Sequence, residues 1–342
     1  MPGATTYVHF RTEQISFPFS PNTSHRRFLP LFDANSTPRF LYRLVAPQVS
    51  GTSSPSKAAP PVIYRNTPDL FEFPPEKAAN ILLNHLLWQR GHEDGCNLMS
   101  WTSSLLFALQ YALYRHRKDG DDLKHITLII IDTSLFPEGT FIQDMEVMRL
   151  FQHADTHLQK FVKYRETEYY FGEYLTQGPL NIQGRCVFAS VQQMINLGLF
   201  GLQPGLADEE QWQCWPKRVL DYRRLFLAQK RVPTTKMDVD TALNISRHCF
   251  GGRWTLPGAI MLLSLQPRCK DDRVISEGFK EHFTPAEIKE AALHKVEAHT
   301  KRLPEVGQFK ELVNFINRSY GLSEYETVVD GVKLLSVCDP KD

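Results

Sequence analysis

The stretch LMSWTSSLLFALQYALYR, residues 98–115, joins a short apolar segment to a helix through a cluster of hydroxyl side chains. From Ser103 onward, apolar residues recur at helical spacing and predict an amphipathic helix. We expect Thr102 or Ser103 to cap this helix, because a hydroxyl there can accept from an otherwise unpaired backbone N–H. Ser100 belongs to the extended segment before the helix. A serine in that position either completes the turn or lines a site for an anion or a ribose.

Segments on both sides of this stretch predict an α+β organisation for residues 39–190. The run RFLYRLVAP (39–47) alternates like a strand, and HITLIIIDTSLFP (125–137) is apolar enough for a strand buried on both faces. Between them, residues 74–91 predict an amphipathic helix with proline at its start. Residues 168–191 predict two short strands interrupted by glycines, the first of them over 168–175.

The remaining segments complete a prediction of three parts. Residues 1–38 are rich in Pro, Ser, Thr and Asn and predict an irregular N-terminal arm. Residues 50–61, SGTSSPSKAAPP, predict a mobile loop within the α+β part. Residues 191–342 carry mostly helical spacing and predict a mainly α-helical C-terminal region.

Charge and hydropathy exclude several classes of protein. The 342 residues contain 39 basic and 38 acidic side chains, a net charge of +1, which provides no strong signal for nucleic-acid binding. No stretch approaches the roughly 20 apolar residues that a membrane span needs. The first residues are too polar for a secretory signal, so we expect an intracellular protein, cytoplasmic or nuclear.

The cysteines agree with that expectation. Six cysteines are scattered without a CxxC pair, a pattern typical of reduced thiols. His92 and Cys96 are four residues apart, a spacing that suits a metal on a helix. The glycines at 91 and 95 disfavour a helix there, so we predict no metal site. His85 lies on the apolar face of its helix and is predicted to be a core histidine with satisfied hydrogen bonds.

Three short motifs occur in a distinctive order. Arg43 in LYRLV precedes Ser100 and Thr102 in SWTSS, which precede Glu173 in EYLTQGPL. This order resembles the Arg–Ser–Glu arrangement of the ADP-ribosyltransferase superfamily, which binds NAD between two small sheets. The resemblance covers about residues 39–190 and implies an α+β core of two small packed sheets with helices. It places catalysis on Glu173 and Ser100, and NAD contacts on Arg43 and Thr102.

The resemblance also implies a chemical role for each side chain. A carboxylate at Glu173 would stabilise the positive charge that develops when the nicotinamide–ribose bond breaks. Ser100 would hold the nicotinamide ribose or support Glu173, and Arg43 would pair with the pyrophosphate through its planar fork. Tyr170 or Tyr111 would stack on the nicotinamide, because aromatic faces suit flat rings.

A second resemblance covers most of residues 39–340. The blocks SWTSSLLFA and YYFGEYL are similar to those of a family of uncharacterised fungal proteins, which carry a domain of unknown function. This resemblance implies no particular activity.

Two positions depart from the transferase pattern. Phe171 stands two residues before Glu173, where members that modify arginine carry Glu or Gln, and Trp101 replaces a small residue of the Ser-Thr-Ser element. These departures argue against arginine as the acceptor. A literal Glu-x-Glu, Glu166 and Glu168, lies ahead of the apolar strand.

Other functions remain open from the sequence. The chain is either an NAD-dependent ADP-ribosyltransferase acting on a protein acceptor, a degenerate relative of one, or a non-catalytic module whose helical half binds a protein partner. A hydrolase using Glu166 or Glu168 together with Glu173 is a third alternative. Arg43 and Glu173 would in the non-catalytic case be ordinary surface residues of half-exposed strands.

Overall fold

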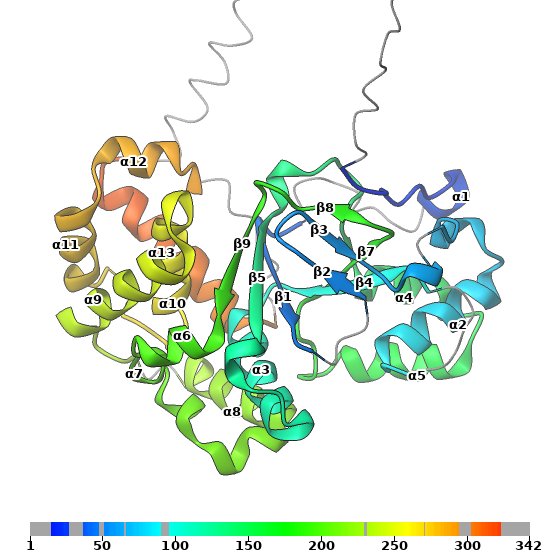
Figure 1. The fold of residues 1–342 in the computed structure, drawn as a ribbon, viewed down its shortest axis with the longest axis horizontal. Coiled ribbons are helices and arrows are strands. Elements are labelled where there is room, and N and C mark those ends of the chain that lie inside the picture. Colours follow the sequence, from blue (N-terminus) through cyan, green and yellow to red (C-terminus); the bar gives the residue numbers. More distant parts are fainter. Residues whose placement is uncertain are drawn as a thin grey trace, which may run out of the picture.

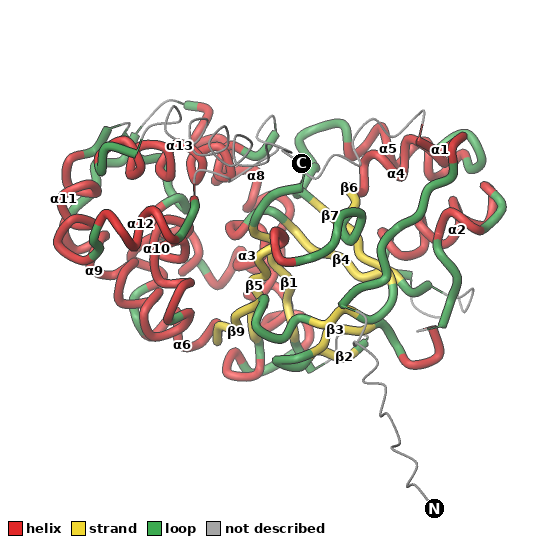
Figure 2. Tube along the Cα trace, turned by 90° about the horizontal axis from the view of Figure 1, so that it is seen from above, coloured by secondary structure: helices red, strands yellow, loops and turns green. Residues whose placement is uncertain are grey.

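The computed structural model of the chain describes residues 15–26, 37–47, 51–64, 66–89, 96–228, 231–269, 271–293 and 302–322. Within these residues the fold is mixed α/β, with two antiparallel sheets (Figures 1 and 2). The larger sheet has the strand order β6-β7-β4-β1-β5-β9, and its strands are Phe40–Val45 (β1), Leu98–Thr102 (β4), Thr127–Asp132 (β5), Ile142–Gln143 (β6), Glu173–Gln177 (β7) and Cys186–Ser190 (β9). The smaller sheet has the order β2-β3-β8, with strands Thr52–Ser53 (β2), Lys57–Ala59 (β3) and Leu180–Asn181 (β8).

The two faces of the larger sheet bury different neighbours, because successive side chains of a strand point to opposite sides. Trp101 of β4 and Tyr174 of β7 lie on the face that packs against Ala58 and Leu180 of the smaller sheet. The opposite face is covered by helices. Strand β5, which pairs with β1 and β9, is buried from Leu128 onward, as its run of apolar residues predicts.

Two groups of helices divide that second face. Helices α2 (Pro75–Leu86), α4 (Asp144–Phe151) and α5 (Thr156–Arg165) bury the side chains of β6, β7 and β4, on the right in Figure 1. Helix α3 (Leu105–Asp119) and the helices after residue 190 cover β1, β5 and β9, on the left. The central strands β4 and β1 therefore lie where the two helical groups meet.

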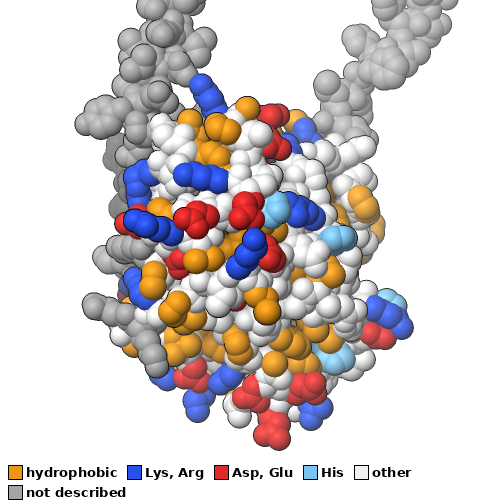
Figure 3. All heavy atoms as spheres, turned by 90° about the vertical axis from the view of Figure 1, so that its left-hand side faces the viewer, with side chains coloured by type: hydrophobic (Ala, Val, Ile, Leu, Met, Phe, Trp, Pro, Cys, Tyr) orange, Lys and Arg blue, Asp and Glu red, His pale blue; other side chains and the backbone are white. Residues whose placement is uncertain are grey.

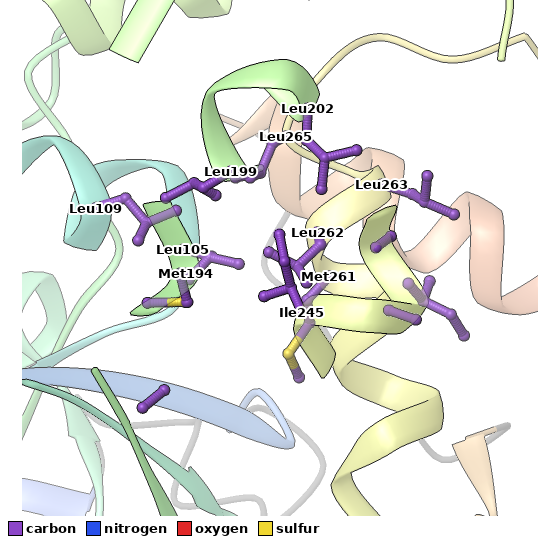
Figure 4. Packing of buried hydrophobic residues seen from close by; sticks show 14 of the residues in the cluster. Leu105, Leu109, Met194, Leu199, Leu202, Ile245, Met261, Leu262, Leu263 and Leu265 are labelled. Atoms are coloured by element: carbon purple, nitrogen blue, oxygen red, sulfur yellow. The ribbon is translucent and has the colours of Figure 1, made fainter. Parts of the chain in front are cut away.

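The C-terminal region is helical, as predicted for residues beyond about 190. Helix α10 is buried on every side, and its Leu262 and Leu263 pack near Leu199, Leu202 and Ile245 (Figure 4). The helices of this region are Val191–Asn196 (α6), Leu199–Leu202 (α7), Trp215–Leu227 (α8), Lys236–Ile245 (α9), Thr255–Leu263 (α10), Arg273–His282 (α11), Pro285–Glu290 (α12) and Pro304–Ser319 (α13).

The shorter helical elements connect these parts. Thr23–Arg26 forms one α-helical turn (α1), and Ser246–Phe250 is a π-helical segment between α9 and α10. The 3₁₀ turns are Val62–Tyr64, Leu70–Glu72, Leu123–His125, Thr133–Leu135, Pro204–Ala207, Glu209–Cys214 and Gly252–Trp254.

The outer surface of the helical region carries both signs of charge. Figure 3 shows basic and acidic side chains interspersed over this side of the molecule, with hydrophobic side chains between them. In the described part of the chain, no helix is both long and apolar enough to cross a membrane.

Residues 50–61, for which the composition predicts a mobile loop, contain regular structure in their described part, 51–61. Residues 52–53 and 57–59 form an antiparallel hairpin, and β3 pairs with β8. Ala58 and Ala59 are buried. Small residues in a polar stretch look like a linker, yet an alanine strand can be covered completely by neighbours that are distant in the sequence.

The N-terminal arm is described over residues 15–26 and 37–38, and residues 1–14 and 27–36 lie outside the described residues. The segment 15–26 packs against the core. Phe17 forms a bridge with Gln177, and Phe19 is buried beside Phe71. Apart from this bridge and α1, residues 15–26 have no regular secondary structure.

Candidate functional site

Arg43, Ser100 and Glu173 come from three neighbouring strands, β1, β4 and β7. Tyr42 lies opposite Thr102, and Thr102 lies opposite Glu173. The Nη1 of Arg43 donates to the backbone carbonyl of Ser100 over 2.7 Å. Residues that are 130 positions apart in the sequence are thus brought within two strand widths of each other.

The guanidinium of Arg43 lies at the junction of β1 and β4. Arg43 follows Tyr42, which pairs with Thr102 across the two strands. The guanidinium of Arg43 donates to the carbonyl of Ser100, and its Cζ lies 5.8 Å from the centre of the Trp101 ring. Burial lowers the pKa of Arg43 to about 10, while Tyr111 opposes that effect. Its Nε is buried and has no hydrogen-bond partner in the described part of the chain. A charged donor is therefore available at the centre of the sheet.

Ser100 contacts His85, which in turn contacts Cys96. Its hydroxyl lies 2.8 Å from Nε2 of His85 on α2, and Nδ1 of the same ring lies 3.3 Å from Sγ of Cys96. Burial lowers the pKa of His85, and the charge of Arg43 lowers it further. The contact with Cys96 and the charge of Glu173 raise the pKa by more, so the net shift is upward. His85 has satisfied hydrogen bonds, as predicted, and the structure places it beside Ser100.

Glu173 is held by a buried ion pair. Its Oε2 accepts from Nη2 of Arg165 on α5 over 2.7 Å, and the two side chains are 12% and 10% exposed. No motif in the sequence pointed to Arg165. The ion pair fixes the direction of the Glu173 carboxylate at the start of β7.

A second carboxylate, Asp144, lies next to this pair. It begins α4 and is completely buried, with Oδ1 accepting from the backbone N–H of Met145 over 2.7 Å. Burial raises the pKa of Asp144 to about 7; the charge of Arg165 opposes the rise and that of Glu173 adds to it. Its Oδ2 has no hydrogen-bond partner among the described residues. A group that changes protonation near neutrality thus adjoins Glu173.

The hydroxyls after Ser100 are used by the fold itself. Thr102 donates to the carbonyl of Phe171 over 2.7 Å and accepts from the backbone N–H of Ser104. Ser104, and neither Thr102 nor Ser103, caps α3, because it accepts from the N–H of Phe107 over 3.1 Å. The predicted cap was wrong because β4 continues through Thr102 and the helix begins only at Leu105.

The two tyrosines considered for stacking differ in their surroundings. Tyr170 is buried, and its hydroxyl accepts from the side-chain amide of Gln143. Tyr111 is half-buried and belongs to an aromatic cluster in which ring centres are 5.0 to 6.1 Å apart. This cluster consists of Trp88, Phe107, Tyr111, Tyr114, Phe171 and Trp215. Trp88 is 50% exposed, so one edge of the cluster faces solvent.

The comparison with known families concerns this part of the chain. Residues 36–191 match a domain of unknown function (DUF7587). The DUF7587 segment contains every residue of the predicted site and ends where α6 begins. No curated protein and no solved structure matches the chain. Among the described residues, no group of three or more His, Cys, Asp or Glu side chains is arranged to hold a metal ion.

Proposed function

We propose that the DUF7587 segment binds NAD at Arg43, Ser100 and Glu173 and transfers its ADP-ribosyl group to a protein acceptor. The observation that carries this proposal is the 2.7 Å contact between Nη1 of Arg43 and the backbone carbonyl of Ser100, whose strand β4 pairs with the strand of Glu173. The three residue types occur in the order of the ADP-ribosyltransferase superfamily, and their positions on three neighbouring strands support the proposal.

The surroundings of Arg43 suit a dinucleotide. The buried Nε without a partner supplies a donor for a phosphate oxygen, and a guanidinium fork fits phosphate geometry. Tyr111, whose phenol acts on the charge of Arg43, belongs to the partly exposed aromatic cluster. Aromatic faces of this kind suit the flat rings of nicotinamide or adenine. We therefore assign the pyrophosphate to Arg43 and a ring of the dinucleotide to Tyr111.

Glu173 is assigned the chemical role. Its ion pair with Arg165 engages Oε2, and we assign Oε1 as the acceptor for a ribose hydroxyl. A carboxylate held in this direction stabilises positive charge developing at the ribose. Ser100 and His85 lie next to it and keep the neighbouring strand in place. Thr102 and Tyr170 support the loop that leads into β7.

A second candidate function is a non-catalytic module whose helical half binds a protein. Leu225 and Leu227 near the end of α8 are 48% and 71% exposed, which favours a contact with a partner at that helix. This function would need neither NAD nor Glu173.

The experiment that separates these functions is an NAD titration followed by thermal unfolding. Binding to the folded state raises the melting temperature by mass action. We expect Arg43→Ala to abolish most of the rise, and Arg224→Ala, which removes an exposed arginine paired with Asp221, to leave it unchanged. Release of nicotinamide by the purified chain is the second readout. No rise and no release would leave the interaction module as the function.

A further inference from the structure

A hydrogen-bonded chain of three reactive side chains adjoins the candidate site. Sγ of Cys96 lies 3.3 Å from Nδ1 of His85, and Nε2 of the same ring lies 2.8 Å from Oγ of Ser100. We propose that Cys96 and His85 form a thiolate–imidazolium pair, and that Cys96 is a modification site for peroxides. This inference does not depend on NAD binding.

The geometry gives each residue a role. A nucleophilic thiol needs a base within hydrogen-bond reach and a third group that orients the base. His85 provides the base through Nδ1, and Ser100 holds the ring through Nε2. Helix α2 carries His85, whereas Cys96 lies two residues before the start of β4, so separate elements position the two groups against each other.

The charges around His85 support the ionised pair. Glu173 from β7 favours the protonated imidazole, and Arg43 from β1 opposes it. Burial by itself raises the pKa of Cys96, but the contact with His85 outweighs it and lowers the pKa. The thiolate is the reactive form of cysteine, so this environment favours reaction.

Other described cysteines show the contrast. Burial raises the pKa of Cys186 to about 11 and that of Cys249 to about 11, so both remain thiols near neutral pH. Cys214 is exposed. Cys96 is half-buried, and partial exposure admits a molecule as small as a peroxide.

The reaction balances with groups that are present. The sulfur of the Cys96 thiolate attacks one oxygen of the peroxide, forming an S–O bond while the O–O bond breaks. The leaving hydroxide takes the proton of the His85 imidazolium and departs as water. The sulfur is oxidised by two electrons to a sulfenic acid, and the peroxide is reduced. His85 is left neutral beside Ser100.

The ionisation is tested by thiolate absorbance in the far ultraviolet, recorded against pH for the wild-type chain and for Cys96→Ser. We expect the difference to titrate well below the ordinary cysteine pKa of about 8.5. The corresponding difference for Cys214→Ser is the matched control for an exposed cysteine. A Cys96 titration at or above about pH 8.5 would overturn the proposal.

The reactivity is tested with hydrogen peroxide and dimedone, a trap for sulfenic acid, followed by mass spectrometry of the peptides. In the wild-type chain near pH 7 we expect trapping at Cys96 to exceed trapping at Cys214. His85→Gln should lower the Cys96 rate by about tenfold or more and spare Cys214. Equal trapping at both cysteines in the wild type contradicts the proposal, whether or not the His85 variant folds.

Discussion

The hydroxyl of Ser104 donates to the carboxylate of Glu305, a residue 201 positions later, over 2.6 Å. The same carboxylate pairs with Arg223, whose Nη1 donates to the carbonyl of Tyr170 over 2.6 Å. This buried network joins the start of α3, two helices of the C-terminal region and the loop that precedes Glu173. The helical region is thereby attached to the candidate site at the point that sets the direction of β7.

Removing the charge of Glu305 should destabilise the fold strongly. Glu305 is 4% exposed, and Glu305→Gln leaves the guanidinium of Arg223 buried without its counter-charge. We expect a loss of about 3 kcal/mol or more in the free energy of unfolding, measured by urea denaturation. The control is Glu281→Gln, which removes an exposed ion pair with Lys236 and should change stability by about 0.5 kcal/mol or less. Equal effects of the two variants would show that the buried network contributes little.

Position 172 requires glycine because of its backbone conformation and because neighbouring atoms leave no room for a Cβ. Its φ is +69°, and an added Cβ would lie 2.3 Å from Oγ of Ser103 and 2.8 Å from Cδ1 of Leu303. Gly184 has a similar φ of +70° but open space around it, so Gly184→Ala should cost only the backbone strain of about 1–2 kcal/mol. Gly172→Ala should lose about 1–3 kcal/mol more, because atoms must move apart. Chemical denaturation of both variants provides the comparison, and a cost no larger at Gly172 would mean that this loop yields easily.

Asp144 predicts a pH dependence of stability. Its pKa in the folded chain, about 7, is above the ordinary value of 3.8. The folded state therefore holds a proton that the unfolded state has released, and this group's contribution to stability falls as the pH rises from about 4 to about 7. Asp144→Asn retains the oxygen that accepts from Met145 and removes the charge. At pH 8 we expect it to unfold with a free energy higher by roughly 1–3 kcal/mol, with little difference near pH 4. Urea midpoints at the two pH values decide this, and a variant less stable at pH 8 would mean that Arg165 needs the charge of Asp144.

Glu173→Gln should separate catalysis from binding. If Glu173 acts on charge that develops during bond breakage, its loss should slow nicotinamide release by about a hundredfold or more and change NAD affinity little. Glu166→Gln is the matched control, because Glu166 also pairs with an arginine, Arg149, but at an exposed position. The two rates are compared under conditions in which both variants are folded by circular dichroism. Equal activity of the two variants would remove Glu173 from the mechanism.

The strands could be predicted where the sequence pattern is local. The apolar run around 125–137 contains β5, and alternation around Arg43 predicts β1, because the spacing of apolar residues within one strand indicates which of its side chains are buried. The strand expected over 168–175 begins only at Glu173. The backbone carbonyls of Tyr170 and Phe171 accept hydrogen bonds from the side chains of Arg223 and Thr102. Both donors are distant in the sequence, so the local spacing of apolar residues could not predict these contacts.

The candidate site divides in the same way. The resemblance of the motif order to the ADP-ribosyltransferase superfamily points to Arg43, Ser100 and Glu173, and their role in binding or catalysis stays a prediction. Arg165 and Asp144 could not be selected, since their importance comes from burial next to Glu173 and not from any motif. His85 was predicted correctly as a residue with satisfied hydrogen bonds, but its partners Cys96 and Ser100 meet it only after α2 packs on β4.

The sequence by itself determined the kinds of elements in this protein: a mixed α/β part, a helical part after about residue 190, and a helix following the hydroxyl cluster of residues 98–115. These properties follow from the spacing of apolar residues over short distances, which depends on a single element at a time. The tertiary structure decided which hydroxyl caps α3, that residues 52–59 form a hairpin in which Ala58 and Ala59 are buried, and that Glu305 reaches Ser104. Those outcomes depend on desolvation and pairing between groups far apart in the chain, and such interactions exist only once the sheet and both groups of helices have packed.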